Sequence, residues 1–470
     1  MQQQRTDDDD GVEGGGPAAK KQKTEETKDA VDAPPPNTAT YTKIRFIGYA
    51  IPTTPASMVP IGDPNGTGAV AGSYLGSECP QTDIRGRLAV LVEAVRTARA
   101  RLPAQAEEEG VMNVFMAPEF YWHSPEGPYL HEGSSPVTEV LALLKDAFPK
   151  SEYPNWLFVC GTAITAKIEN KEKLYGLNST LTRNAVVESL CKQWRHSYGP
   201  LSEVILDMIF NFVKNCHAYP LLEVRNRAVI VSNLALDVPG GSTPTNAMTT
   251  EKYFCSNEDL LLYEVNGKKV VTEQMVTYRP LDLTAGDVKK TPLDNHAIFR
   301  FNHGNGTHVL DAAVEICLDH RDVRLRRNLD NHPFHLQLIP SCGIQIKENG
   351  CAVEAGGLVF NVDGQYALGQ GGKGAQKGAL NNVACLYADY VDAGDATYGA
   401  HTQLARVKTR AVGAHVNHKG SKNATFHDDL DPVILTVVPV VPVKGLHTYF
   451  AGGPGELHIY GLTDPLPLYV

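Results

Sequence analysis

Residues 312–321 read Ala-Ala-Val-Glu-Ile-Cys-Leu-Asp-His-Arg, an apolar run that ends at a single cysteine and passes at once into charged sequence. This pattern is typical of a strand that stops at the edge of a sheet, and it would bring the Cys317 thiol to that edge, where a nucleophile is useful. Free cysteines are among the most often buried residues, so a core position is the better interpretation of Cys317 taken alone. The partners that the rest of the chain offers decide between the two interpretations.

Residues 111–122 supply a candidate general base. This apolar run is closed by Ala-Pro and Glu119, and Phe120, Tyr121 and Trp122 follow directly. A carboxylate among aromatic rings is poorly solvated, so its pKa should rise and it could move protons near neutral pH. The alternative is that Glu119 caps or salt-bridges a loop.

A candidate lysine lies in residues 249–259, after the apolar run at 227–231. Lys252 stands there between acidic and aromatic residues, where its alternative role is an ordinary surface ion pair of little energetic value. Glu258 follows six positions later and could orient the reacting groups, or could be a solvated loop acid.

In the order Glu, Lys, Cys, these segments resemble the nitrilase superfamily of carbon–nitrogen hydrolases. The resemblance spans about residues 44 to 462, and its best matches are residues 117–120, 251–254 and 315–321. Looser matches lie at residues 158–163 and 339–343. The resemblance implies an α/β fold, a four-layer αββα sandwich whose helical faces usually pack against a second subunit, and hence a homodimer or larger homo-oligomer.

The resemblance also implies a role for each residue. Cys317 would attack an amide or nitrile carbon and form a thioester, with Glu119 as general base and Lys252 as oxyanion stabiliser. The backbone N–H of Leu318 would be a second oxyanion donor, and one such donor is worth about 2.7–4 kcal/mol. The residues predicted to bind substrate or to hold the reacting groups are Tyr121, Trp122, Glu258, Leu318 and His320.

Two intervals depart from the family pattern, because Glu119, Lys252 and Cys317 are unusually far apart. Insertions must account for this, and residues 201–217 read as an extra amphipathic helix. Lys192 is therefore a second candidate for the lysine, although it lacks a following acidic partner. We prefer Lys252.

Composition divides the 470 residues into two parts. Residues 1–40 are an acidic, low-complexity segment with almost no large apolar side chain, so we expect a disordered tail. Residues 41–470 are expected to form a single nitrilase-like domain. Nine cysteines, without a C-x-x-C pair, favour a reducing compartment and give no zinc signature.

The hydrophobic pattern of the domain alternates between helices and strands. Amphipathic helices are expected at residues 86–102 and 136–148, and strands at 44–50, 156–166, 228–234, 308–316 and 335–339. Residues 433–443 read as a pair of core strands, too short to cross a bilayer. The glycine-rich residues 364–378 read as a loop without a dinucleotide fingerprint, so no nucleotide site is assigned to it. No cofactor and no metal are expected.

Charge bounds the partners. The net charge of −10 weighs against nucleic acid, and no membrane segment or signal peptide is expected. We therefore predict a cytoplasmic protein, although the basic cluster Lys20–Lys23 also allows nuclear import. The arginines after the nucleophile, at positions 321, 324, 326 and 327, are interpreted as ion-pairing, with recognition of an anionic substrate as the alternative.

The sequence therefore predicts a thiol hydrolase that acts on a small amide or nitrile. The alternative is a catalytically silent binding or regulatory protein with the same fold, and a Cys-His protease is a weaker third possibility. We also expect Cys317 to be the thiol that reacts first with an alkylating agent.

Overall fold

The structure, a computed structural model, describes residues 40–53, 57–60, 70–104, 109–125, 127–168, 222–234, 246–252, 262–265, 268–271, 276–278, 298–303, 308–328, 334–365, 402–413, 421–427, 435–450 and 452–469. The expected tail, the expected helix at 201–217 and most of the glycine-rich loop lie outside these residues. Lys192 and Glu258 lie outside them as well.

The first of two large sheets is built around three parallel strands. These are β1 (Lys43–Ala50), β4 (Val111–Ala117) and β6 (Trp156–Ile168). Every residue of β4 is buried, as expected for a strand covered on both faces. The sheet continues on one side through β7 (Leu222–Ser232) to β11 (Val276–Tyr278), and on the other side through β19 (Glu456–Tyr460) to β18 (Leu435–Pro439). Three short strands join this sheet beside the main path: β8 (Ala247–Glu251) pairs with β7, β5 (Tyr129–His131) pairs with β6, and β20 (Leu466–Pro467) pairs with β1.

In the described part of the chain, the second sheet has six strands. In spatial order they are β12 (Ile298–His303), β13 (His308–Val314), β14 (Phe334–Ser341), β15 (Val353–Asp363), β16 (Thr402–Thr409) and β17 (Thr425–Phe426). The three central strands run parallel to one another, and the outer pairs are antiparallel.

The two sheets pack face to face over one hydrophobic core. Alternate residues of β4 enter this core, among them Val114 and Met116, and they meet Val314 and Leu338 from the second sheet. Two-residue alternation along each strand separates this inner face from the outer one. Cys317 belongs to the same inner core, where it is only 4% exposed.

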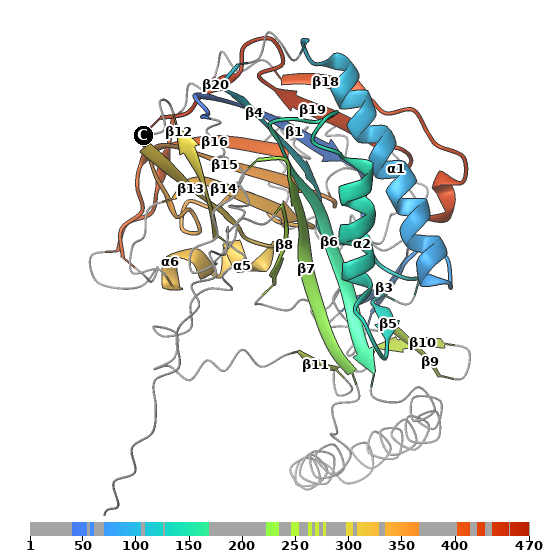
Figure 1. The fold of residues 1–470 in the computed structure, drawn as a ribbon. Coiled ribbons are helices and arrows are strands. Elements are labelled where there is room, and N and C mark those ends of the chain that lie inside the picture. The colour runs from blue at the N-terminus through green and yellow to red at the C-terminus, as the bar shows by residue number, and fades with distance from the viewer. Residues whose placement is uncertain are drawn as a thin grey trace, which may run out of the picture. The chain divides into compact units, whose positions relative to one another are not determined.

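Two helices cover the outer face of the first sheet (Figure 1). They are α1 (Pro80–Arg101) and α2 (Pro136–Ala147), each with proline in its first turn, where the missing N–H costs nothing. The Ser135 hydroxyl caps α2 by accepting a hydrogen bond from Val137. The helices pack their apolar stripes, including Leu91 and Leu144, on the outer side chains of β4 and β6.

The outer face of the second sheet differs from the four-layer expectation. In the described part of the chain it is covered by the short helix α6 (Arg324–Asn328), through Leu325, and by non-helical segments that include Cys351 and Ala424. The helix α5 (Leu318–Arg321) is a single turn. Two sheets and one full helical layer are therefore established, and a complete second helical layer is not.

The expected pair of core strands at 433–443 is wrong. Within the described residues 435–443 a single strand, β18, forms at the end of the sheet path, pairs with β19, and exposes Leu435 and Val437. Val441, which follows the strand, is exposed as well. The strand ends at Pro439, and edge strands tolerate proline. The remaining elements are two short ladders, β2 (Ser57–Pro60) with β3 (Val70–Ser73) and β9 (Leu262–Val265) with β10 (Lys268–Val271), and the 3-10 turn η6 (Leu446–Thr448).

Candidate active site

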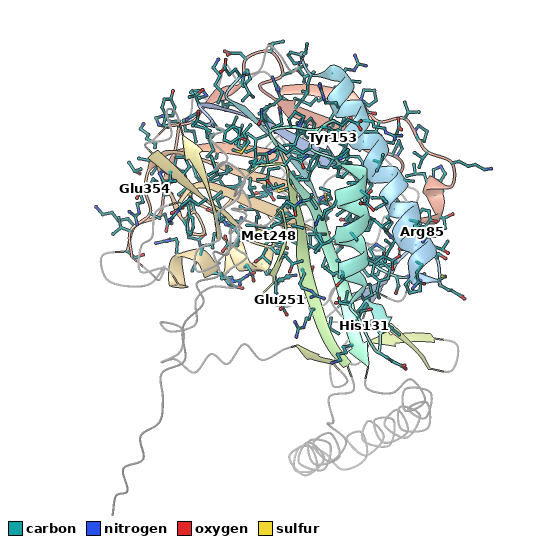
Figure 2. The ribbon with its side chains drawn as sticks, viewed as in Figure 1. Arg85, His131, Tyr153, Met248, Glu251 and Glu354 are labelled. Atoms are coloured by element: carbon teal, nitrogen blue, oxygen red, sulfur yellow. The ribbon has the colours of Figure 1, made fainter. Side chains whose placement is uncertain are left out.

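Three strand ends bring the predicted residues together. Glu119 follows β4 by two residues, Lys252 follows β8 directly, and Cys317 follows β13 by three residues. Figure 2 labels Met248 and Glu251 along β8, the strand of the first sheet that ends immediately before Lys252. The site therefore lies between the two sheets. Its carboxylate and its ammonium group come from the first sheet, and its thiol comes from the second.

A sharp turn after β4 positions Glu119. Phe120 has a φ of +59°, in the left-handed region, and its N–H donates to the Thr162 hydroxyl at 2.9 Å. The chain passes directly over Gly161, where a Cβ atom would lie 2.5 Å from the Pro118 carbonyl oxygen, so only glycine fits there. The Glu119 carbonyl accepts a 2.6 Å hydrogen bond from the Thr53 hydroxyl, which fixes the turn from the other side.

The Glu119 carboxylate forms a buried ion pair with Lys252. The Lys252 ammonium lies 2.8 Å from Oε1, and the two side chains are 1% and 0% exposed. The same oxygen accepts a 2.9 Å hydrogen bond from the Asn226 amide. The ammonium also lies 5.4 Å from the centre of the Phe120 ring, within the range of a cation–π contact.

Cys317 occupies a strained backbone position. It is the N-cap residue of α5 and has a φ of +46° and a ψ of −110°. Residues other than glycine rarely adopt this backbone conformation. The N–H of Cys317 donates to the Pro340 carbonyl at 3.2 Å, and its own carbonyl accepts from His320 at 2.9 Å. Its sulfur lies 3.8 Å from the carbonyl oxygen of Cys342.

The surroundings of Cys317 keep the thiol protonated. Burial raises the pKa of the thiol well above its ordinary value, and the Glu119 carboxylate raises it further as a negative charge and hydrogen-bond partner. The Lys252 ammonium and the backbone of Cys342 act in the opposite direction. The chain therefore holds a thiol beside a carboxylate at this position, not a preformed thiolate.

Cys79 contrasts with Cys317. It is exposed at the N-cap of α1, and hydrogen bonds with Thr82 lower the pKa of its thiol. An exposed thiol with a lowered pKa reacts with alkylating agents before a buried thiol with a raised one. The structure therefore leads us to predict the opposite order from the sequence, with Cys79 reacting before Cys317.

The structure places Tyr121 and Trp122 away from the site. Both side chains lie in the core between the first sheet and the helices, with Tyr121 donating to the Arg87 carbonyl and the Trp122 indole N–H donating to the Cys160 carbonyl. The physical reason is the turn at Phe120, which leaves Phe120 beside Lys252 and directs the next two rings outward. A substrate-facing role for Tyr121 and Trp122 does not fit these positions.

Leu318 and His320 lie beside Cys317 in α5. Leu318 is the first residue of the helix and packs partly buried against the inner core. His320 accepts a 2.8 Å hydrogen bond from the Lys347 N–H at Nε2, so its Nδ1 carries the proton and donates to Glu315 at 3.1 Å. The ring therefore holds the segment around Cys317 in place, and its observed contacts are with protein groups.

Two of the arginines that follow Cys317, Arg324 and Arg326, bind protein groups. Arg324 donates to the Asp319 carboxylate and to the Glu251 carbonyl, both at 2.7 Å. Arg326 donates to three backbone carbonyls, including that of Val412 at 3.1 Å. The contact of Arg324 with Asp319 is an ion pair, as the sequence interpretation expects, whereas Arg326 binds backbone carbonyls. Among the described residues, no cluster of His, Cys, Asp or Glu could hold a metal ion.

Two contributors to the site were missed by sequence reasoning. Asn226 lies in the middle of β7 with no motif around it, and its contact with Glu119 depends on how β7 pairs with its neighbours. Asp363 ends β15 and accepts hydrogen bonds from Ser341 and from the N–H groups of Gly343 and Ile344, so it shapes the loop that carries Cys342. A polar residue at the end of an apolar strand was the one signal available for Asp363.

Comparison with known proteins gives a distant structural likeness. No family model and no curated protein matches the sequence. Among solved structures, Nit3 of Saccharomyces cerevisiae, a member of branch 10 of the nitrilase superfamily, matches with 10% identity and a TM-score of 0.29 over 68% of this chain and 76% of its own. A mutant amidase from Nesterenkonia sp. AN1 in complex with butyramide matches with 9% identity and a TM-score of 0.25 over 70% and 80%. At this level neither protein's chemistry carries over to this chain.

Proposed function

We propose that this protein is a thiol hydrolase that cleaves a non-peptide C–N bond of an amide or nitrile through a thioester on Cys317. The observation that carries the proposal is the buried 2.8 Å ion pair between Glu119 and Lys252, with the Cys317 thiol against the same carboxylate. A buried charge pair is costly to desolvate and weak evidence for stability, so its place beside a strained cysteine favours a chemical role.

On an amide, the Cys317 sulfur attacks the carbonyl carbon while the thiol proton passes to Glu119. The Lys252 ammonium and the Leu318 N–H stabilise the oxyanion of the tetrahedral intermediate. Glu119 then returns the proton to the nitrogen as the C–N bond breaks, so that ammonia or an amine leaves and a thioester remains. Glu119 next removes a proton from water as it attacks the thioester, and the carboxylic acid leaves with the thiol restored.

The alternative is a binding or regulatory protein with a silent site. The observation in its favour is the thiol itself, which is 4% exposed and has a raised pKa. A thiol in this state is inert unless a bound substrate and the adjacent base act on it together. Formation of a covalent adduct distinguishes the two proposals.

The test is mass spectrometry of the full chain after incubation with a panel of small amides and nitriles. We expect an acyl adduct on the peptide that contains Cys317 and its loss in the Cys317→Ala variant. Cys351→Ala is the matched control, because Cys351 is fully buried in the other core of the second sheet. Two results would reject the proposal. One is hydrolysis of compounds in the panel without any adduct on Cys317, and the other is equally fast hydrolysis by the Cys317→Ala variant.

A further inference from the structure

Asn226 contacts two of the three proposed catalytic residues. It lies in β7, and its side-chain amide donates to Glu119 Oε1 at 2.9 Å. Its backbone carbonyl accepts the N–H of Lys252 at 2.8 Å, immediately after the β7–β8 ladder ends at Arg227 and Glu251. Asn226 is 5% exposed, so both contacts are made away from water.

The amide and the ammonium act on the same oxygen, but they do different things there. The final torsion of a glutamate side chain is broad, so the carboxylate plane is set by its hydrogen bonds. A lysine ammonium is a point charge on a flexible stem and fixes this plane poorly. An amide N–H held by a strand is directional, because hydrogen bonds weaken steeply away from linearity.

We propose that Asn226 is a positioning residue that fixes the plane of the Glu119 carboxylate and thereby presents it to the Cys317 thiol. The inference rests on the proposed function, since it assigns how the base of that reaction is oriented. Lys252 supplies the counter-charge and Asn226 supplies the direction. The Asn226 backbone carbonyl also accepts the N–H of Lys252. One residue of β7 therefore contacts both partners of the ion pair and positions them relative to each other.

The experiment measures how fast chloroacetamide alkylates Cys317 as a function of pH. Peptide mapping by mass spectrometry follows Cys317 in the full-length chain, and the exposed Cys79 in the same sample is the internal reference. In Asn226→Ala we expect the Cys317 rate to fall about 10- to 100-fold, the worth of one hydrogen bond to a charged group. We also expect the acidic limb of the profile to move to higher pH, because the carboxylate has lost a donor.

A second variant guards against a failure to fold. Asn226→Asp keeps the shape of the side chain but places a second carboxyl group against Glu119. Two carboxyl groups in contact share a proton, so the acidic limb should move by a pH unit or more. The Cys79 rate should stay unchanged in both variants.

The matched control is Asn233→Ala. Asn233 follows the same strand, is 8% exposed, and donates to the carbonyls of Phe148 at 3.2 Å and Tyr153 at 2.7 Å, far along β7 from Glu119. This variant should lower the melting temperature and leave the Cys317 profile in place. If Asn226→Ala changes stability alone, as Asn233→Ala does, Asn226 is a structural residue and the inference is overturned.

Failure of the proposed function gives a different result. A wild-type chain that forms no adduct with the amide and nitrile panel rejects the hydrolase. The alkylation profiles still decide whether Asn226 controls the thiol through Glu119. An adduct in the wild type together with unchanged profiles in both Asn226 variants rejects the positioning role and leaves the hydrolase standing.

Discussion

Replacing Lys252 with methionine should destabilise the protein in a pH-dependent way. The change removes the cation of a pair whose atoms lie 2.8 Å apart with side chains 1% and 0% exposed. At an effective dielectric constant of about 20, that attraction is about 6 kcal/mol. The loss in stability is smaller, because the orphaned Glu119 takes up a proton instead. A carboxyl group with an ordinary pKa of about 4.3 can be protonated at pH 7 for about 3.7 kcal/mol.

The pH dependence has a definite sign. In Lys252→Met the folded protein holds a proton on Glu119 that the unfolded chain releases above about pH 4.3, so the pKa of this carboxyl group is raised in the folded variant. The free energy of unfolding of the variant should then fall as pH rises, by about 1.4 kcal/mol per unit. Relative to the wild type, the variant should lose about 3–4 kcal/mol at pH 7 and recover most of it near pH 5.

The assay is urea unfolding of both proteins at several pH values between 5 and 7. The double variant Glu119→Gln, Lys252→Met is the control: both charges of this pair are gone, so the pH-dependent part of the loss should disappear. A loss below about 1 kcal/mol at pH 7, the range of an exposed ion pair, would refute the reasoning. So would a loss of full size that does not change with pH.

Three further predictions concern the thiols and the amino-terminal segment. Cys317→Ala should abolish turnover and adduct formation without loss of the fold. Cys317→Gly should be more stable than Cys317→Ala by about 1 kcal/mol, because glycine adopts a φ of +46° without strain. Equal or reversed unfolding midpoints of the two variants would contradict this stability prediction. Iodoacetamide at neutral pH should label Cys79 before Cys317, as followed by peptide mapping, and the opposite order would mean that the Cys317 thiol is ionised at rest. A chain that begins at Thr40 should keep the melting temperature and turnover of the full chain, and a loss of several degrees would show that the tail docks on the domain. If the tail carries an import signal, replacing the lysines of the Lys20–Lys23 cluster by alanine should change the localisation of the protein and neither of these two measurements.

Much of the fold could be predicted because its elements carry strong periodicity. The expected helix at 136–148 became α2, and the strand expected at 44–50 became β1 (Lys43–Ala50). The expected helix at 86–102 began six residues earlier, at Pro80, because a first-turn proline is compatible with a helix and the early turn carries few apolar residues. Among the described residues no helix is long and apolar enough to span a membrane.

The site could be predicted only where a strand end and a reactive residue coincide. Glu119 and Cys317 both follow apolar strands, and the structure brings both together with Lys252. Asn226 gave no such signal, because its contact with Glu119 arises from the pairing of β7 with β6 and β8, which is non-local. The outward position of Trp122 could not be foreseen either, because it depends on a left-handed residue at Phe120 that local propensity does not favour.

Backbone strain helps to separate a working site from a silent one. Cys317 and Phe120 both have positive φ, and a residue held in such a region costs about 1–3 kcal/mol. The buried ion pair of Glu119 and Lys252 lies beside these two residues, and such a pair does not in general stabilise a fold relative to apolar side chains. A binding protein that never used the thiol would gain stability by replacing Cys317 with glycine and the ion pair with apolar residues. Strain and buried charge therefore coincide at Glu119, Lys252 and Cys317, and this coincidence supports the proposed hydrolase over the silent alternative.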